Sequence, residues 1–247
     1  MCNLYQMVPK EDIERHFRAI VADGYRAGAV GPFGQGAFLS VRDGDLALTE
    51  AQWGLIAPGA TTRRPASRAV LTNNARAESV AGKWTYREAW RRGRRCLIPA
   101  SWYQEPNWEC GRNIWWQLRR ADGAPWALAG LWSEWTDPAS GEIVASYTML
   151  TCNCDGHPLL GRLHKPDPAL PADAQDKRAV VSLEPHEWDA WLHGDEAAAR
   201  ALVRPASSEV FDLSVTRATD AALAAGVSRL SRTSAKPAPD DAQGSLI

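Results

Sequence analysis

The middle of this 247-residue chain is a series of short apolar segments, rich in Trp, Ile, Leu and Val, with Gly- or Pro-containing turns between them. The segments are shorter than typical helices, and their aromatic and β-branched residues favour strands. We therefore predict successive strands at 94–99, 113–119, 126–132, 143–151 and 178–183. A chain with so many consecutive strands must fold around a sheet, which restricts it to a β-rich or α+β architecture.

Helix and turn signals on both sides of this series complete the predicted fold. Ile13 and Phe17 recur at helical spacing after Pro9, and strands at 37–41 and 46–49 flank the turn sequence Arg-Asp-Gly-Asp. We also expect a strand that runs through 52–56 and ends before Pro58-Gly59. Helices are expected at 85–93, from 184 and at 195–203, loops at 24–36 and 158–177, and a last strand at 209–215. The prediction is an α+β fold: one domain (1–215) with a mixed or antiparallel, barrel-like β core and peripheral helices, then a largely disordered tail (216–247).

Length and composition exclude several classes of protein. Hydrophobic residues make up 45% of the chain, enough for a substantial core. The sequence contains no signal peptide and no run of about 18 apolar residues, so we expect a cytoplasmic protein without membrane contact. Its five cysteines are an odd number, which indicates free thiols. Cys152, Cys154 and His157 are too few ligands for structural zinc, so no metal is expected.

Positive charge is concentrated in residues 61–95, which contain ten basic and two acidic residues, although the net charge of the whole chain is −1. Such a local excess is the electrostatic pattern of a protein that binds a phosphate backbone. The alternative is a solvated basic face without a ligand. Among the twelve tryptophans, Trp53 and Trp102 adjoin Gly or turn-like sequence and are the better candidates for stacking on a base, although a core position suits them equally.

The second residue, Cys2, has the most distinctive chemistry. Removal of Met1, which a small second residue permits, would leave an α-amine beside the Cys2 thiol. Both groups are partly reactive near neutral pH. The amine can condense with an aldehyde to an imine, and the thiolate can then close a thiazolidine ring. The alternative is an inert, frayed N-terminus.

Three further regions of the chain could assist Cys2. Asn74 and Arg76 alternate with apolar residues, so in an extended chain they share one face. Glu105 follows an apolar strand and aromatic residues, where partial burial would raise its pKa and suit it to proton transfer. His164 could act as an acid or base near neutral pH. Each position also has a plain alternative, such as a surface ion pair or a loop cap.

Taken together, these residues resemble the SRAP family of abasic-site processing proteins, whose members share a Cys after Met and form covalent links to abasic DNA. The resemblance extends from residue 1 to about 192. Its marks, in the family's order, are Met1-Cys2, QWGLI at 52–56, NARAE at 74–78, RCLIPA at 95–100 with Tyr103 and Glu105, AGLW at 129–132, and a late His.

The resemblance implies a role for each site residue. Cys2 would form the thiazolidine with the abasic aldehyde, and Asn74 would hold the Cys2 amine or the sugar. Glu105 would shuttle protons, and His164 would act on the deoxyribose hydroxyl to aid ring opening, strand cleavage or reversal. DNA binding would fall to Arg76 on a phosphate, with Trp53 and Arg178 beside it. The implied partner is single-stranded DNA with abasic sites, bound by a nucleoid-associated monomer that needs no cofactor or metal.

The sequence departs from the family pattern at two points. Most members carry Gly-Arg where this chain has Asn3-Leu4, and an insertion separates His164 from Arg178. Two other functions stay open: a cysteine-type (auto)peptidase that uses Cys2 with His164 and Glu105 or Asn74, and a DNA-binding module in which Cys2 is inert.

Overall fold

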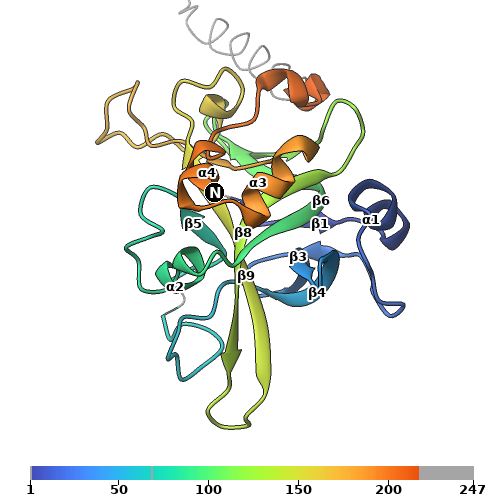
Figure 1. Ribbon diagram of the computed structural model, residues 1–247. Helices are drawn as coiled ribbons and strands as arrows, with labels where there is room; N and C mark the ends of the chain where they lie inside the picture. Colours follow the sequence, from blue (N-terminus) through green and yellow to red (C-terminus); the bar gives the residue numbers. More distant parts are fainter. Residues whose placement is uncertain (1, 68, 217–247) are drawn as a thin grey trace, which may run out of the picture.

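A closed barrel of five strands forms the centre of the molecule, which is a computed structural model that describes residues 2–67 and 69–216 (Figure 1). The strands pair in the circular order β9–β4–β3–β6–β8–β9, and all pairs are antiparallel except β4 with β9. Their bounds are Gln35–Arg42 (β3), Asp45–Trp53 (β4), Arg95–Asn107 (β6), Trp126–Thr136 (β8) and Ile143–Asn153 (β9). The predicted α+β fold with a mixed, barrel-like sheet is therefore confirmed.

Five shorter strands extend the barrel and bring distant parts of the chain together. They are Tyr5–Met7 (β1), Ala29–Val30 (β2), Asn74–Arg76 (β5), Ile114–Leu118 (β7) and Arg178–Val180 (β10). β1 pairs with β6 and with β2, and β7 pairs with β6. β5 and β10 both pair with β9, β5 in parallel. The N-terminus, β5 and β10 therefore meet around β6 and β9.

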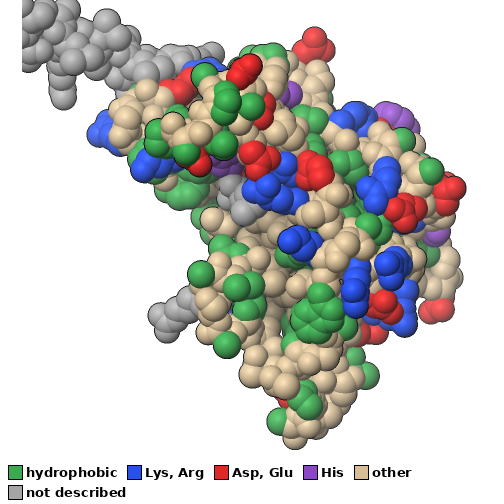
Figure 2. Space-filling model, turned by 90° about the vertical axis from the view of Figure 1, so that its left-hand side faces the viewer, with side chains coloured by type: hydrophobic (Ala, Val, Ile, Leu, Met, Phe, Trp, Pro, Cys, Tyr) green, Lys and Arg blue, Asp and Glu red, His purple; other side chains and the backbone are tan. Residues whose placement is uncertain are grey.

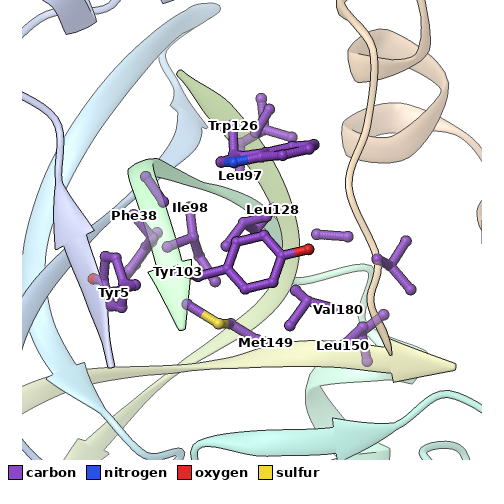
Figure 3. Packing of buried hydrophobic residues seen from close by; sticks show 14 of the residues in the cluster. Tyr5, Phe38, Leu97, Ile98, Tyr103, Trp126, Leu128, Met149, Leu150 and Val180 are labelled. Carbon is purple, nitrogen blue, oxygen red and sulfur yellow. The ribbon is translucent and has the colours of Figure 1, made fainter. Parts of the chain in front are cut away.

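The barrel interior is packed with side chains from several strands. Figure 3 shows Tyr103 with Ile98, Leu128, Met149 and Val180 around it, and all five are at most 2% exposed. Side chains alternate along a strand, so the alternating burial along the end of β6 places Glu105 on the same inward face as Tyr103. A carboxyl group therefore lies at the edge of the hydrophobic core.

The helices lie on the outside of the barrel and bury one face each. They are Lys10–Phe17 (α1), Arg87–Arg91 (α2), Trp188–His193 (α3) and Glu196–Ala201 (α4). The 3₁₀ turn Pro185–Glu187 (η2), closed by a capping box with Glu184, leads into α3. Trp191 of α3 donates a hydrogen bond to the Cys96 carbonyl of β6 at 3.0 Å, which fixes this helix on the barrel. Within residues 2–67 and 69–216, no helix combines the length and hydropathy that spanning a bilayer requires.

Two local predictions differ from the structure. The expected strand at 209–215 consists of two 3₁₀ turns, Ser208–Val210 (η3) and Leu213–Thr216 (η4), and only Phe211 makes a β-bridge, to Arg120. Phe211 packs on Trp126, whereas Leu213 is 52% exposed. The segment therefore contacts the barrel through one buried residue and does not have the alternating buried side chains of a strand. The strand expected through 52–56 ends at Trp53, because Gly54 adopts φ +146°. The tail from 217 lies outside the described residues.

Candidate active site

Cys2 is completely buried beside the end of β6. Antiparallel pairing sets Tyr5 opposite Tyr103, and the Gln104 N–H donates to the Leu4 carbonyl at 2.9 Å, so the chain before β1 runs alongside the end of β6. The Cys2 thiol donates to the Leu4 carbonyl at 3.4 Å. Burial, and secondly the charge of Glu105, raise the pKa of the Cys2 thiol, so at neutral pH the sulfur is protonated.

Two asparagines hold the backbone of Cys2. The Cys2 carbonyl oxygen accepts hydrogen bonds from Asn74 Nδ2 at 2.7 Å and from Asn73 Nδ2 at 3.2 Å. Parallel pairing of β5 with β9 sets Asn74 beside Met149 and turns its side chain away from the buried Ala75. Asn74 therefore contacts Cys2 as the sequence indicates, but through the carbonyl oxygen of Cys2.

Glu105 is the carboxyl group of the site, and its pKa lies near neutral pH. Its side chain is 2% exposed, and burial raises the pKa of this carboxyl from 4.5 to about 7. Its electrostatic effect on Cys2 places it close to the thiol. At neutral pH the acid and carboxylate forms of Glu105 are both well populated, as general acid–base catalysis requires.

His164 lies next to Glu105 on the loop that follows the 3₁₀ turn Leu160–Arg162 (η1). Its Nε2 is 3.6 Å from Glu105 Oε2 and 2.9 Å from the Arg178 carbonyl oxygen. Because a carbonyl only accepts, Nε2 carries the proton and Nδ1 the lone pair. Burial lowers the pKa of His164 to about 4, so the imidazole is neutral at pH 7.

His164 is held in a left-handed backbone conformation, φ 65°, which is uncommon for a residue other than glycine. Its backbone N–H donates to the Pro106 carbonyl at 2.6 Å, and Lys177 Nζ donates to its carbonyl oxygen at 2.7 Å. The sequence-predicted quartet of Cys2, Asn74, Glu105 and His164 thus converges from four separate parts of the chain. The site combines a sulfur nucleophile, a group that titrates near neutrality and a neutral imidazole.

Substitution of Glu105 by Gln is expected to stabilise the protein above neutral pH. The raised pKa means that the stability contributed by neutral Glu105 is complete below pH 4.5 and is lost as pH rises through 7. Gln keeps the shape without the buried charge, so the free energy of unfolding of the variant should exceed that of the wild type by about 3 kcal/mol at pH 8. Urea denaturation between pH 4 and 8 measures this difference.

His164 changes the wild-type profile in the opposite direction, because a lowered pKa makes stability rise with pH between 4 and 6.5. The contribution of His164 cancels when the free energies of unfolding of Glu105→Gln and wild type are subtracted, since both proteins contain His164. A difference that did not grow between pH 5 and 8 would contradict the raised pKa of Glu105.

Two residues expected to bind DNA have buried side chains. Trp53 is 0% exposed, packs edge-on against Tyr5 at 5.1 Å and donates to the Asn73 carbonyl at 2.9 Å. Its ring is thus not available for stacking, and it instead supports the asparagine that holds Cys2. Arg178 is 5% exposed and pairs with Glu78 at 2.7 Å and Asp176 at 3.0 Å. Its guanidinium is an internal ion-pair partner rather than an open phosphate contact.

Arg76 is exposed at the edge of β5, as a phosphate contact requires, and forms an ion pair with Asp176 at 2.6 Å. Sequence reasoning missed Asp176, because the pair joins residues from β5 and from the end of the insertion. It also missed Asn73, whose only signal is its position beside Asn74. Trp102 is half-buried, with the Arg119 guanidinium 6.0 Å from its ring.

The face that carries β5 and α2 displays Lys and Arg side chains mixed with acidic ones (Figure 2). Exposed basic residues of segment 61–95 on the described surface are Arg63, Arg64, Arg76, Lys83, Arg87, Arg91 and Arg92. Arg95, in contrast, is buried and donates to the carbonyls of Trp191 and Gly194. The basic segment therefore supplies both surface charge and one internal anchor. In the described part of the chain, no cluster of three or more His, Cys, Asp or Glu side chains is arranged to hold a metal ion.

Comparisons with solved structures find the same fold in two bacterial proteins. A protein from Bordetella bronchiseptica is 32% identical, with a TM-score of 0.74 over 85% of this chain and 97% of that chain. A protein from Bacteroides thetaiotaomicron has a TM-score of 0.66 at 21% identity, over 85% of this chain and 90% of that chain. The second likeness concerns the fold alone.

Sequence comparison adds a named relative. The chain is 26% identical over 140 residues to the abasic site processing protein HMCES of Xenopus tropicalis, a match that covers 50% of this chain and 41% of that protein. It therefore spans less than half of the length of this relative. The family model described as SOS response associated peptidase (SRAP) matches residues 1–220. Since this model covers most of the chain, the protein belongs to the SRAP family.

Proposed function

We propose that this protein processes abasic sites in DNA by capturing the aldehyde of the ring-opened deoxyribose on Cys2 as a covalent thiazolidine. The observation that carries the proposal is the convergence of buried Cys2 and Glu105 with half-buried Asn74 and His164 in one site. Membership of the SRAP family and the name of the HMCES relative support this substrate.

The chemistry begins with loss of Met1, which frees the α-amine of Cys2. The amine nitrogen attacks the aldehyde carbon and passes a proton to the oxygen to give a carbinolamine, and protonation of the hydroxyl by Glu105 then releases water and leaves a protonated imine. The Cys2 sulfur adds to the imine carbon while its proton passes to the carboxylate of Glu105, which gives the neutral thiazolidine and restores the acid. The net change is one thiazolidine ring formed and one water released. A carboxyl of pKa about 7 can serve in both proton transfers.

The hydrogen bonds of Asn73 and Asn74 to the Cys2 carbonyl fix the backbone that carries both reacting groups. In this proposal neutral His164 acts on the deoxyribose hydroxyl, with its Nδ1 lone pair as the base. The same group can assist ring opening, β-elimination of the strand, and reversal of the adduct. Each of these is a proton transfer for which an imidazole of low pKa is available in the neutral form.

Single-stranded DNA is the proposed ligand of the basic face. Arg76 lies closest in sequence to the site and would contact a phosphate beside the lesion, with Lys83 and the exposed arginines of α2 extending the contact. All four site residues come from one chain, which supports action as a monomer.

A cysteine peptidase is the second candidate, and the electrostatics of Cys2 disfavour it. Cysteine hydrolases need a thiolate, usually beside a protonated His, whereas burial raises the pKa of Cys2 and lowers that of His164. In thiazolidine formation the amine attacks first, so the thiol can lose its proton later in the sequence. Hydrolysis of the Met1–Cys2 bond by the protein itself stays compatible with its family description.

Intact-mass spectrometry of the protein incubated with an abasic single-stranded oligonucleotide tests the proposal. The expected product has the mass of the chain without Met1 plus the DNA, minus one water. Undamaged DNA is the control and should give no product. A covalent product with abasic DNA excludes the hypothesis that the protein is a DNA-binding module with an inert Cys2. Turnover of peptides without any DNA adduct would instead establish the peptidase.

A further inference from the structure

The proposed phosphate contact, Arg76, is already paired with an anion of the same chain. Arg76 Nη1 lies 2.6 Å from Asp176 Oδ2, and Arg178 Nη1 lies 3.0 Å from the other oxygen, Asp176 Oδ1. The carboxylate thus bridges two guanidinium groups, as a phosphate does in many nucleic-acid complexes. Although burial opposes it, the hydrogen bond from Arg178 and the charge of Arg76 hold the pKa of Asp176 below its ordinary value, so this anion is ionised at neutral pH.

The backbone places Asp176 in this position. Asp155 accepts hydrogen bonds from the backbone N–H groups of Asp176 at 3.1 Å and of Lys177 at 2.7 Å. Asn153 Nδ2 in turn donates to Asp155 at 3.0 Å. Asp176 itself adopts φ 52°, a left-handed conformation that Asp tolerates better than most residues. The end of the insertion is therefore anchored so that one carboxylate faces Arg76.

The two arginines and Lys83 line a surface cavity of about 620 Å³, which also contains Glu78 and Asp176. Glu78 pairs with Arg178 at 2.7 Å, and the Arg178 guanidinium also donates to the Thr151 carbonyl at 2.9 Å. Arg178 would thus keep two partners if Asp176 moved away. Arg76 would be left to bind an external anion.

We propose that Asp176 stands in for a DNA phosphate on Arg76 and competes with the substrate strand, so that it limits DNA affinity until the strand displaces it. The inference rests on the proposed function for the identity of its ligand, a phosphodiester. Displacement is feasible because the side chains of Arg76 and Asp176 are 52% and 38% exposed, and an ion pair at such exposure is weak. A charged phosphate supplies the replacement hydrogen bonds.

Fluorescence anisotropy with an undamaged single-stranded oligonucleotide tests this competition without any covalent step. Asp176→Asn should bind about fivefold more tightly than wild type at low salt, because Arg76 gains a phosphate without losing an internal partner. The plot of log affinity against log salt should keep the wild-type slope, because Arg76 contacts one phosphate in both complexes once Asp176 has been displaced. Arg76→Gln should weaken binding and flatten the slope by about 0.7, the increment for one phosphate contact on a single strand.

Asp173→Asn is the matched control, because Asp173 lies in the same insertion, is exposed and carries the same charge. It should change affinity by less than the Asp176 variant. In the Arg76→Gln background, Asp176→Asn should have no further effect. Equal gains from both Asp variants, or a gain that persists without Arg76, would overturn the competition and identify a general effect of net charge.

The result separates this inference from the proposed function. Unchanged binding by Asp176→Asn, together with a normal abasic adduct, would refute the role of Asp176 alone. An effect of Asp176→Asn on undamaged DNA without an abasic adduct would support the competition and refute the covalent chemistry. Absence of DNA binding by every variant would refute both. Melting temperatures of the variants verify that all remain folded.

Discussion

Replacement of Cys2 by Ala is expected to abolish the denaturation-resistant adduct between the protein and an abasic single-stranded oligonucleotide. Ala keeps the α-amine but lacks the sulfur, so the reaction stops at an imine, which water reverses. Denaturing gels should therefore show no adduct for Cys2→Ala, whereas reduction with borohydride should trap the imine and restore a band. The wild type should give the band without reduction.

Cys110→Ala is the control for this experiment, because Cys110 is a half-buried thiol within the chain with no α-amine beside it, and its loss should leave the adduct unchanged. A form that retains Met1 should likewise give no stable adduct without reduction, since its Cys2 nitrogen is an amide and cannot become part of a thiazolidine ring. A stable adduct that survives Cys2→Ala would rule out the thiazolidine.

Substitution of Glu105 by Gln is expected to slow adduct formation about 100-fold or more at pH 7, the usual contribution of a positioned general acid–base group. The pH profile separates this role from a merely structural one. In the wild type, protonation of the α-amine, whose pKa is about 7.7, should slow the reaction toward low pH. Toward high pH the rate should fall because Glu105, whose pKa is about 7, loses the proton needed for dehydration. The two limbs give a maximum between them.

Glu105→Gln should lose the alkaline limb and keep the acidic one. Single-turnover rates from pH 5.5 to 9 measure both limbs. Glu134→Gln, an exposed glutamate on β8, should match wild type throughout. An alkaline limb that persisted in Glu105→Gln would assign the titration to another group. The same substitution should raise stability at pH 8, so the buried carboxyl favours reaction at the expense of stability, as is common at active sites.

The parts of the fold that local pattern determines were predicted well. The hairpin of β3 and β4 forms across the expected Arg-Asp-Gly-Asp turn, with Arg42 opposite Asp45, because the turn chemistry and the alternation agree. Strands β7, β8 and β9 lie where apolar runs end at Gly or Pro. For β6 the prediction ended at 99, yet the strand continues to Asn107 and so includes Glu105. Tyr103, Glu105 and Asn107 are buried in alternation with the half-buried Gln104 and Pro106, a pattern that only the folded strand shows.

The remainder depends on contacts between distant segments, which no local pattern contains. Trp53 beside Gly54 has the same local sequence whether its ring is exposed or enclosed, and the parallel pairing of Trp53 with Tyr147 decides the outcome. Arg178 is buried because Glu78, a hundred positions away, neutralises it. The sequence could indicate that Asn74 lies beside Cys2, because both belong to the motifs of the family resemblance. It could not indicate that Asn74 binds the carbonyl oxygen of Cys2.

The pairing of β1 with β6 has a further consequence for how the protein is made. Tyr5 contacts Tyr103, and the β10 backbone that positions His164 comes later still, so the site cannot assemble until most of the domain has left the ribosome. Before that point, the Cys2 segment lies apart from Glu105, His164 and the two asparagines. Under the proposed mechanism, proton transfer by Glu105 and His164 therefore assists aldehyde capture only after folding is complete.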